Sequence, residues 1–354
     1  MKLDVKQGKG YSQKWTSVMF VASALLLSAC RMGEELLPMP YQEDLVIYTA
    51  QEEGIYGPLV KEFEERTNLN VRVEEGSAQE LRQYLENKTG EEGGLAWDLV
   101  FGVGTETLEQ SAHFWHPYES SQASSIVPGF LCAHHRWTPF SVQPLVLIYN
   151  TNVVTYRELP VGWDSLLEPR WKGRVGIADP LHSDVCFGAL TAAVSASDEE
   201  DYLEQLLENI NYCPAESIQK VNEGVRDGHY SVGVTTEEWA QSLTAEGADV
   251  DYIYPQEGEA AFWDGTAIAA GCSHLEAAKQ FLDFTVERDT QQMLLFGLDR
   301  RPVRTDVHLP SGLVSLEQLA DRKEKKEESC GQEENVLNRW KECLEHHQMG
   351  DGEA

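Results

Sequence analysis

The sequence predicts an α/β fold built on a mostly parallel sheet. Short runs of apolar and β-branched residues alternate with segments of helical spacing along residues 45–300, and parallel strands need such helical crossovers between them. The chain of 354 residues is 42% hydrophobic, which is enough apolar material for a sizeable core. Once an N-terminal segment is set aside, the rest of the chain is long enough for two lobes.

The first half of the chain alternates regularly between strand and helix patterns. Residues 45–49 form an apolar, β-branched run, which indicates a buried strand. The apolar residues between 55 and 63 then share one helical face, so we predict a helix that ends near Asn68. On the same grounds we predict strands at 71–74, 99–101 and 145–149, and helices around 81–85 and from Thr105. The glycines at 102 and 104 resemble a phosphate-binding loop only loosely, so no nucleotide site is predicted.

The alternation continues to about residue 300. The strands that we predict there are 173–178, 231–234, 250–254 and 266–270. The helices that we predict are 184–196, 201–210, 217–227, 237–245, 275–288 and 290–296. Beyond them the chain is highly charged, but Leu337, Trp340 and Leu344 recur at helical spacing. We therefore expect a docked C-terminal helix and a frayed tail within 319–354.

The N-terminus has the layout of a secretory signal. Lysines precede the apolar run Val18–Leu27, and small residues follow it. The run is too short to cross a bilayer, for which a helix needs about 20 apolar residues. Leu27-Ser28-Ala29-Cys30 resembles the bacterial lipobox, in which cleavage leaves a lipidated cysteine. We expect a signal peptide at 1–29, lipidation at Cys30 and a tether at 30–44, with the protein anchored to the cell membrane on its extracytoplasmic face.

Charge and cysteine content exclude some partners. The formal net charge is -31 at pH 7, and a surface this acidic repels nucleic acid and anionic lipid. None of the cysteines has a CxxC spacing, so they predict no metal or redox site. Cys330 and Cys343 could form a local bridge, and buried free thiols are the alternative for the others.

A wider resemblance rests on segments between residue 45 and about residue 310. The most specific is Trp163–Gly173, which reads WDSLLEPRWKG. The other segments are Leu45–Glu53, Pro58–Glu64, Tyr149–Thr151, Ala178–Pro180, Tyr254-Pro255, Asp264–Ile268, Ala277–Phe284 and Arg300–Arg304. On these segments the chain resembles the extracytoplasmic solute-binding proteins of ATP-driven importers. The resemblance is to the cluster with ferric-ion-, thiamine-, phosphonate- and hexose-phosphate-binding members.

The resemblance implies a two-lobe type II periplasmic-binding-protein fold, in which two crossover strands join the lobes and the ligand lies in the cleft between them. By analogy the crossovers fall near 142–148 and 250–256. Lobe 1 would comprise 45–141 and 255–318, and lobe 2 would comprise 142–254. In open α/β sheets, ligands bind at the carboxyl ends of strands and the N-termini of helices. The ligand-binding candidates at such loop ends are Thr49, Gln51, Glu52, Gly104, Thr105, Ser183, Asp184, Thr235, Thr236, Glu237 and Arg301.

Several of these candidates have a second interpretation. Hydroxyl, amide and carboxylate side chains at loop ends also cap helices. Asp184 stands where many relatives have small residues, and a carboxylate about 5 Å from a bound phosphate would repel it by roughly 3 kcal/mol at an effective dielectric of 20. Asp184 therefore points away, or the ligand is cationic or zwitterionic. One of Arg300, Arg301 and Arg304 could hold an anion, with surface ion pairs as the alternative.

We predict no metal centre. Ferric relatives supply adjacent tyrosines after the strand that corresponds to 231–234, where this chain has Thr235-Thr236-Glu237-Glu238-Trp239. Adjacent helix residues point about 100° apart, so both glutamates cannot easily ligate one ion. His113 and His116 lack a cysteine or carboxylate frame. Trp239, Trp263 and Tyr48 could stack on a ligand ring, or belong to the core.

The resemblance implies a binding protein rather than an enzyme. It would capture a small solute without a cofactor and present it, as an anchored monomer, to the permease subunits of an ABC importer. The ligand stays open among a phosphorylated sugar or phosphonate, a thiamine-like compound and an iron complex. A sensory protein that serves a membrane histidine kinase is the alternative. An extracytoplasmic enzyme is a third class, for which no nucleophile or HExxH motif is present. On this view Glu237→Ala should weaken binding without unfolding the protein.

Overall fold

The computed structural model describes residues 43–88, 94–197, 199–257, 261–318 and 333–351. The predicted signal peptide, Cys30, Cys330 and the tether up to residue 42 lie outside the described residues, as does the side chain of Asp184. None of the helices in the described part combines the length and the apolar character needed to cross a bilayer.

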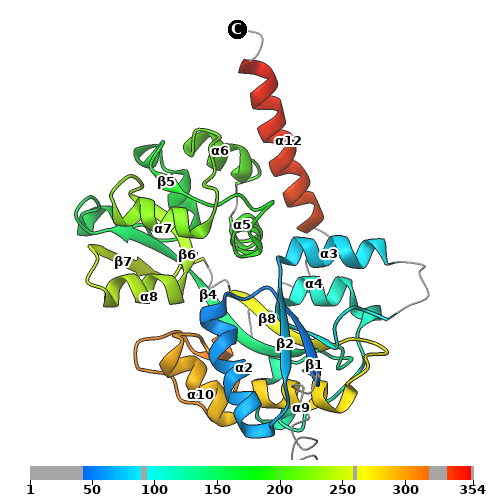
Figure 1. Ribbon diagram of the computed structural model, residues 1–354. Coiled ribbons are helices and arrows are strands. Elements are labelled where there is room, and N and C mark those ends of the chain that lie inside the picture. Colours follow the sequence, from blue (N-terminus) through cyan, green and yellow to red (C-terminus); the bar gives the residue numbers. More distant parts are fainter. Residues whose placement is uncertain (1–42, 89–93, 198, 258–260, 319–332, 352–354) are drawn as a thin grey trace, which may run out of the picture. The chain divides into compact units, whose positions relative to one another are not determined.

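The strands form one continuous mixed sheet in the order β2-β1-β3-β8-β4-β6-β5, with β7 paired to β4 (Figure 1). Their bounds are β1 Leu45–Thr49, β2 Val71–Glu75, β3 Leu99–Gly104, β4 Thr138–Asn150, β5 Val175–Gly176, β6 Val232–Thr236, β7 Val250–Ile253 and β8 Ala261–Ile268. Among these strands, β1 pairs parallel with β2 and β3, and β5 with β6, whereas every pairing of β4 and β8 is antiparallel. The prediction of a mostly parallel sheet is therefore wrong, because the two long strands run against their neighbours.

Strand β4 passes from one half of the sheet to the other. Its first part, from Thr138 to Pro144, pairs with β8, and its second part, from Leu145 onward, pairs with β6 and β7. All 13 residues of the strand are buried. The sequence analysis predicted only the second part, because Pro139 and Pro144 lack the N–H group that a central strand normally donates. Strand β7 still pairs with the second part of β4, whereas the next strand, β8, pairs with the first part, so the chain has returned to the first half of the sheet.

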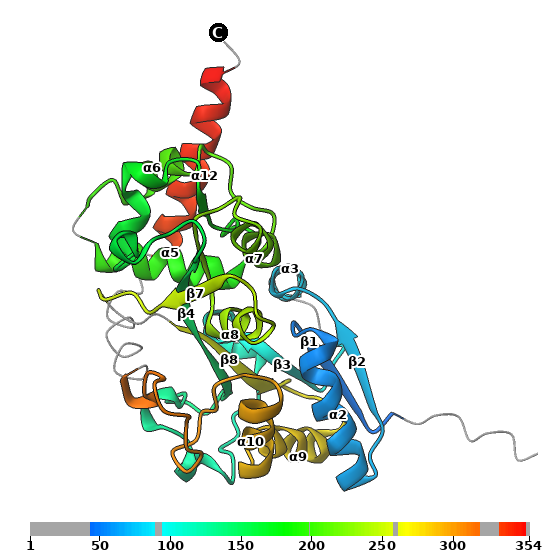
Figure 2. The ribbon, with the colours of Figure 1, turned by 90° about the vertical axis from the view of Figure 1, so that its left-hand side faces the viewer.

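Helices gather in two groups at the two ends of the sheet (Figures 1 and 2). The first group is α2 Glu53–Thr67, α3 Ala78–Asn87, α4 Thr105–Gln110, α9 Leu275–Thr285 and α10 Arg288–Gly297. The second group is α5 Asp184–Ala196, α6 Tyr202–Asn209, α7 Ile218–Arg226, α8 Glu237–Ala245 and α12 Glu333–Asp351. Short 3-10 helices are Ala112–Phe114, Ala123–Ser125, Pro128–Phe130, Tyr156–Glu158, Trp163–Leu167 and Pro169–Trp171.

The apolar core is divided in the same way. One cluster of buried residues comes from 145–250 and also takes in Val336 and Trp340 of α12. Three further clusters come from 45–142 and 263–316. We keep the name lobe 1 for the part that holds these three clusters and lobe 2 for the part that holds the first. The C-terminal helix thus packs on lobe 2, through the apolar spacing seen in the sequence.

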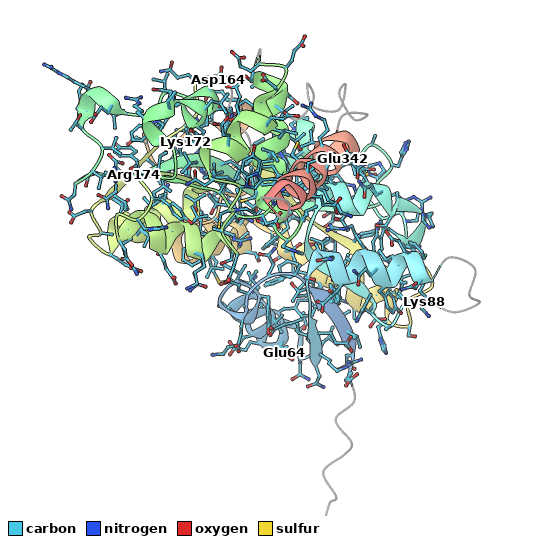
Figure 3. The ribbon with its side chains drawn as sticks, turned by 90° about the horizontal axis from the view of Figure 1, so that it is seen from above. Glu64, Lys88, Asp164, Lys172, Arg174 and Glu342 are labelled. Atoms are coloured by element: carbon cyan, nitrogen blue, oxygen red, sulfur yellow. The ribbon has the colours of Figure 1, made fainter. Side chains whose placement is uncertain are left out.

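Charged side chains lie mainly on the outside of both lobes. Asp164, Lys172, Arg174 and Glu342 are exposed, and Figure 3 labels them among the side chains of lobe 2 and α12. The Nζ atom of Lys172 lies 2.6 Å from a carboxylate oxygen of Glu208, but both side chains are more than half exposed. Exposed pairs of this kind contribute about 0–1 kcal/mol, so folding rests on the buried clusters rather than on surface charge.

Candidate ligand-binding cleft

A cavity of about 360 Å³ lies between the lobes. Lobe 1 contributes Ala50, Gln51, Glu52, Ile55, Ser77, Ala78, Gln79, Arg82, Gly102 and Gly104 to its wall. Lobe 2 contributes Leu181, His182, Ser183, Val185, Glu216, Ser217, Ile218, Thr236, Glu238 and Trp239. Gln143 on β4, Phe262 on β8 and Arg300 complete the wall.

Five helices of at least nine residues begin at this cavity, as does the six-residue helix α4, which follows Gly104. The residues that precede the five longer helices and line the cavity are Glu52 before α2, Ser77 before α3, Ser183 before α5, Ser217 before α7 and Thr236 before α8. A helix N-terminus leaves backbone N–H groups without intrahelical partners and carries about half a positive charge. The convergence of five such ends favours a negatively charged group in the cavity.

The serine residues at these ends both cap their helices and face the cavity. The hydroxyl of Ser77 accepts a hydrogen bond from the backbone N–H of Glu80 at 3.1 Å, and that of Ser217 accepts one from Lys220 at 3.2 Å. Ser183 accepts one from the N–H of Cys186 at 3.2 Å. A hydroxyl that accepts a cap hydrogen bond keeps its own O–H to donate. Capping and ligand contact are therefore compatible for Ser183 and Ser217, whereas the O–H of Ser77 already donates to Glu80 Oε2 at 3.1 Å.

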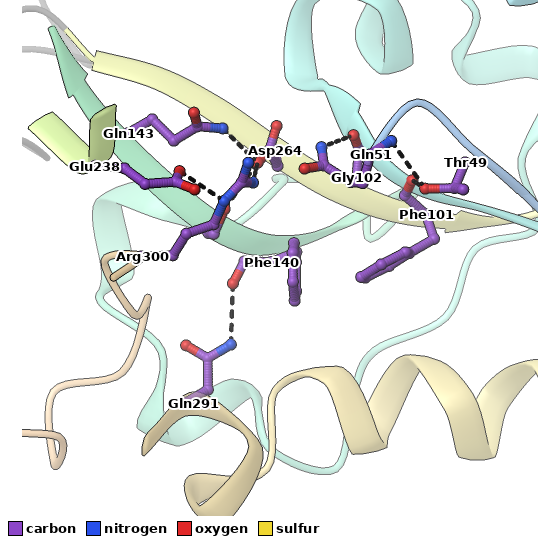
Figure 4. Close-up of polar contacts among 11 residues, drawn as sticks. Thr49, Gln51, Phe101, Gly102, Phe140, Gln143, Glu238, Asp264, Gln291 and Arg300 are labelled. Atoms are coloured by element: carbon purple, nitrogen blue, oxygen red, sulfur yellow. Dashed lines mark hydrogen bonds and ion pairs between the residues drawn. The ribbon is translucent and has the colours of Figure 1, made fainter. Parts of the chain in front are cut away.

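Arg300 is held at the cavity wall by two carboxylates (Figure 4). Its Nη1 donates to Oδ2 of Asp264 at 2.9 Å, and its Nε lies 2.9 Å from Oε2 of Glu238. Asp264 is fully buried and also accepts hydrogen bonds from Ser141 Oγ at 2.7 Å and Gln143 Nε2 at 3.0 Å. Burial raises the pKa of both carboxyl groups, and the guanidinium opposes this rise. Much of the charge of Arg300 is thus compensated within the protein.

The other charged residues at the cavity include both positive and negative side chains. Arg82 extends from α3, and its Nη1 donates to Thr107 Oγ1 at 3.0 Å. Glu52 and Glu216 are exposed carboxylates in the cavity wall. Carboxylates accept hydrogen bonds from hydroxyl and amino groups, whereas the guanidinium and the helix ends attract anions. The cavity is therefore suited to a solute that carries an anionic group beside hydrogen-bond donors.

Five of the predicted ligand residues line the cavity. They are Gln51, Glu52, Gly104, Ser183 and Thr236. Thr49, Thr105 and Thr235 are buried and do not line it. The hydroxyl of Thr49 donates to the carbonyl oxygen of Phe101 at 2.9 Å, so it joins β1 to β3 (Figure 4). Successive strand residues point to opposite faces, which is why Thr236 reaches the cavity and Thr235 does not.

Glu237 and Arg301, also predicted as ligand residues, contact each other instead. Both side chains are only 2% exposed, and neither lines the cavity. The Nε and Nη2 atoms of Arg301 each donate to one carboxylate oxygen of Glu237 at 2.7 Å, and the hydroxyl of Tyr254 donates to the same carboxylate. Because adjacent helix residues point about 100° apart, Glu238 faces the cavity while Glu237 faces Arg301.

The sequence analysis missed several residues of the cavity wall. Ser77 had a readable signal, because Ser77 and Glu80 form a capping box ahead of an apolar segment. Arg82 follows one turn later on the same helix. Gln143 and Phe262 gave no local signal, since only the pairing of β4 with β8 brings them together. Trp239 lines the cavity, whereas Trp263 and Tyr48 belong to the core.

The donor set of the cavity differs from that of a metal centre. In the described residues no tyrosine lines the cavity, and no group of three or more His, Cys, Asp or Glu side chains could hold a metal ion. Hard cations such as iron(III) need several anionic oxygen ligands. The cavity alone supplies too few such ligands at one point.

Comparison with known proteins confirms the resemblance and the fold. A family model described as bacterial extracellular solute-binding protein matches residues 91–319, well over half of the chain. The chain is 25% identical over 324 residues to iron uptake protein A1 of Synechocystis, which covers 85% of this chain and 88% of that protein. It is 24% identical over 289 residues to the Fe(3+)-binding periplasmic protein of Serratia marcescens, with coverages of 77% and 82%.

The fold is shared with solved structures of two-lobe binding proteins. One is the periplasmic binding protein AfuA from Actinobacillus pleuropneumoniae with fructose-6-phosphate bound. The TM-score is 0.70 at 19% identity, and the match covers 85% of this chain and 98% of that one.

Proposed function

The chain belongs to the family of bacterial extracellular solute-binding proteins, and on this premise we propose that its cleft captures a small anionic solute that also carries hydroxyl or amino groups. The observation that carries this proposal is the convergence of five helix N-termini with Arg82 on one cavity of about 360 Å³. The exposed carboxylates of Glu52 and Glu216 would then accept hydrogen bonds from the donors of the solute.

Phosphorylated sugars and phosphonates fit this description best. Their oxygens match the backbone N–H groups and serine hydroxyls at the helix ends, and sugar hydroxyls match the carboxylates. A thiamine-like compound would need an anionic group of its own. Iron, which the curated relatives are named for, would enter as an anionic complex whose chelator supplies most of the ligands, because no tyrosine in the described residues lines the cavity.

We also propose delivery to an ABC importer by an anchored protein. Closure of the lobes on the solute would create the form that a permease recognises, so that affinity includes the free energy of closing. Binding without chemical change is in keeping with the relatives, which are binding proteins.

A thermal-shift screen tests the ligand class. We expect phosphorylated sugars or phosphonates to raise the melting temperature, because ligand at 100 times its Kd stabilises the folded state by about 2.7 kcal/mol. Arg82→Gln should weaken the best hit by roughly 10- to 100-fold, the usual loss for one hydrogen bond to a charged group. Arg226→Gln, an exposed arginine at the C-terminal end of α7, is the matched control. A screen in which only cations or neutral compounds bind would overturn the proposal.

A separate experiment tests the lipid anchor. Cys30→Ala should abolish lipidation and leave the protein either unprocessed or released from the membrane. Fractionation, with metabolic labelling by a fatty acid, gives the readout. A Cys30→Ala protein that is still processed and still held at the membrane would show that the lipobox assignment is wrong.

A further inference from the structure

A second chamber of about 520 Å³ adjoins the cavity. The two share Arg82, Gly104, Leu181 and Phe262 in their walls, so they form successive parts of one interlobe space. The character of the wall changes from one to the other. Of the helix N-cap residues that line the first cavity, only Gly104 before α4 also lines the second. Phe187 and Leu337 join Leu181 and Phe262 to give an apolar part of the wall, while Glu106, Thr107 and Gln110 of α4 supply polar groups to the rest of it.

Leu337 reaches this chamber because α12 is docked on lobe 2 (Figure 1). Trp340 is fully buried on the same helix, and its indole N–H donates to Asp179 Oδ1 at 3.3 Å, beside the chamber residue Leu181. The Nη2 atom of Arg339 lies 3.0 Å from both carboxylate oxygens of Glu204 on α6. Helix α12 lies outside residues 91–319, the part that the family model matches, so this wall of the chamber comes from an element of the chain beyond the family match.

We propose that the cleft takes an elongated solute, with its anionic group in the first cavity and an apolar or aromatic group in the second chamber. This inference rests on the proposed function, because it assigns the anionic end to the cavity already described. Arg82 lies in both walls and would contact the solute where the two groups join. An apolar group that leaves water for the apolar part of the chamber wall gains affinity in proportion to the area it buries.

A comparison of phenylphosphonate with methylphosphonate tests the second chamber separately from the first cavity. The two compounds share one anionic group and differ only in the size of the apolar group. Isothermal titration of each is expected to show phenylphosphonate binding about 10- to 100-fold more tightly, the gain for burial of most of a phenyl ring. The heat-capacity change should also be more negative for phenylphosphonate, since that is the marker of apolar burial.

Position 188 offers a matched pair of variants. Gly188 lines the chamber from α5, and a Cβ atom added there would meet no atom within 4 Å. Gly188→Leu should place a branched apolar side chain in the chamber and reduce the advantage of phenylphosphonate, while methylphosphonate binds as before. Gly188→Ala should keep most of the advantage. Both changes raise helix propensity, so the variants should fold. Leu337→Trp fills the same space from α12 and provides an independent check.

The outcomes are distinguishable. If neither phosphonate binds, the proposed anionic solute is wrong, and this inference fails with it. If both bind with equal affinity, or if Gly188→Leu and Leu337→Trp leave the phenyl advantage intact, the two-part site is overturned while the proposed function stands.

Discussion

Replacing Glu237 by alanine is expected to lower the free energy of unfolding by about 3–5 kcal/mol, the usual cost of removing one partner from a buried ion pair. Arg301 would keep its positive charge with a side chain that is only 2% exposed, and it would lose two hydrogen bonds of 2.7 Å. The hydroxyl of Tyr254 would lose its carboxylate partner as well. We therefore expect the pair to act on stability rather than on the ligand, although the sequence had suggested ligand contact for both residues.

Urea unfolding measures this effect. Glu246→Ala removes an exposed carboxylate at the end of the same helix and should change stability by no more than about 0.5 kcal/mol. The double variant Glu237→Leu with Arg301→Met should recover much of the loss, because replacing a whole buried pair by apolar residues is often neutral. Titration of the best ligand at a temperature where Glu237→Ala is folded should give nearly unchanged affinity. Wild-type stability with lost binding would contradict this assignment.

Trp340→Ala is the second change with a large expected effect. The side chain is fully buried in the core cluster that includes residues of α5 and α6, and removal of a buried tryptophan costs about 3–5 kcal/mol. The hydrogen bond to Asp179 would be lost too. Trp340 and Val336 are buried in the core of lobe 2, whereas Cys343 and Leu344 of α12 are only partly buried against it, so the helix should detach and remove Leu337 from the second chamber.

Differential scanning calorimetry and limited proteolysis test this prediction together. The melting temperature should fall, and new cleavage sites should appear in α12 before the rest of the chain is cut. Glu342→Ala changes an exposed residue of the same helix and serves as the control (Figure 3). An unchanged melting temperature, with α12 still protected, would mean that the helix is held by something other than Trp340.

Local patterns predicted the elements whose stability depends on residues close in the chain. The apolar run 45–49 forms β1, as predicted, and the apolar residues spaced along 55–63 include the buried face of α2. The serine and threonine residues before α5 and α8 cap those helices, which is one of the two roles that the sequence left open for such loop ends, because a cap is decided within four residues. Leu337, Trp340 and Leu344 predicted α12 by the same periodicity.

Local sequence patterns gave wrong or incomplete predictions where contacts between distant segments determine the structure. Pro139 and Pro144 made the first part of β4 look unlike a strand, yet it pairs with β8 and is fully buried. The strand expected at 173–178 is reduced to Val175–Gly176, because only these residues find a partner in β6. The local sequence does not reveal that Glu237 faces a buried arginine while its neighbour Glu238 faces the cavity.

The sequence by itself determined the class of fold, the family resemblance and the helix ends that carry the caps, since each depends on the order of nearby residues. Only the tertiary structure decided which of those helix ends meet at one cavity and that α12 contributes a wall to the chamber beside it. The tertiary structure also brings together Glu237 and Arg301, which are 64 residues apart in the sequence. The physical reason is that charge pairing and cavity shape depend on distance in space, which is set in part by β4 as it runs from one half of the sheet into the other.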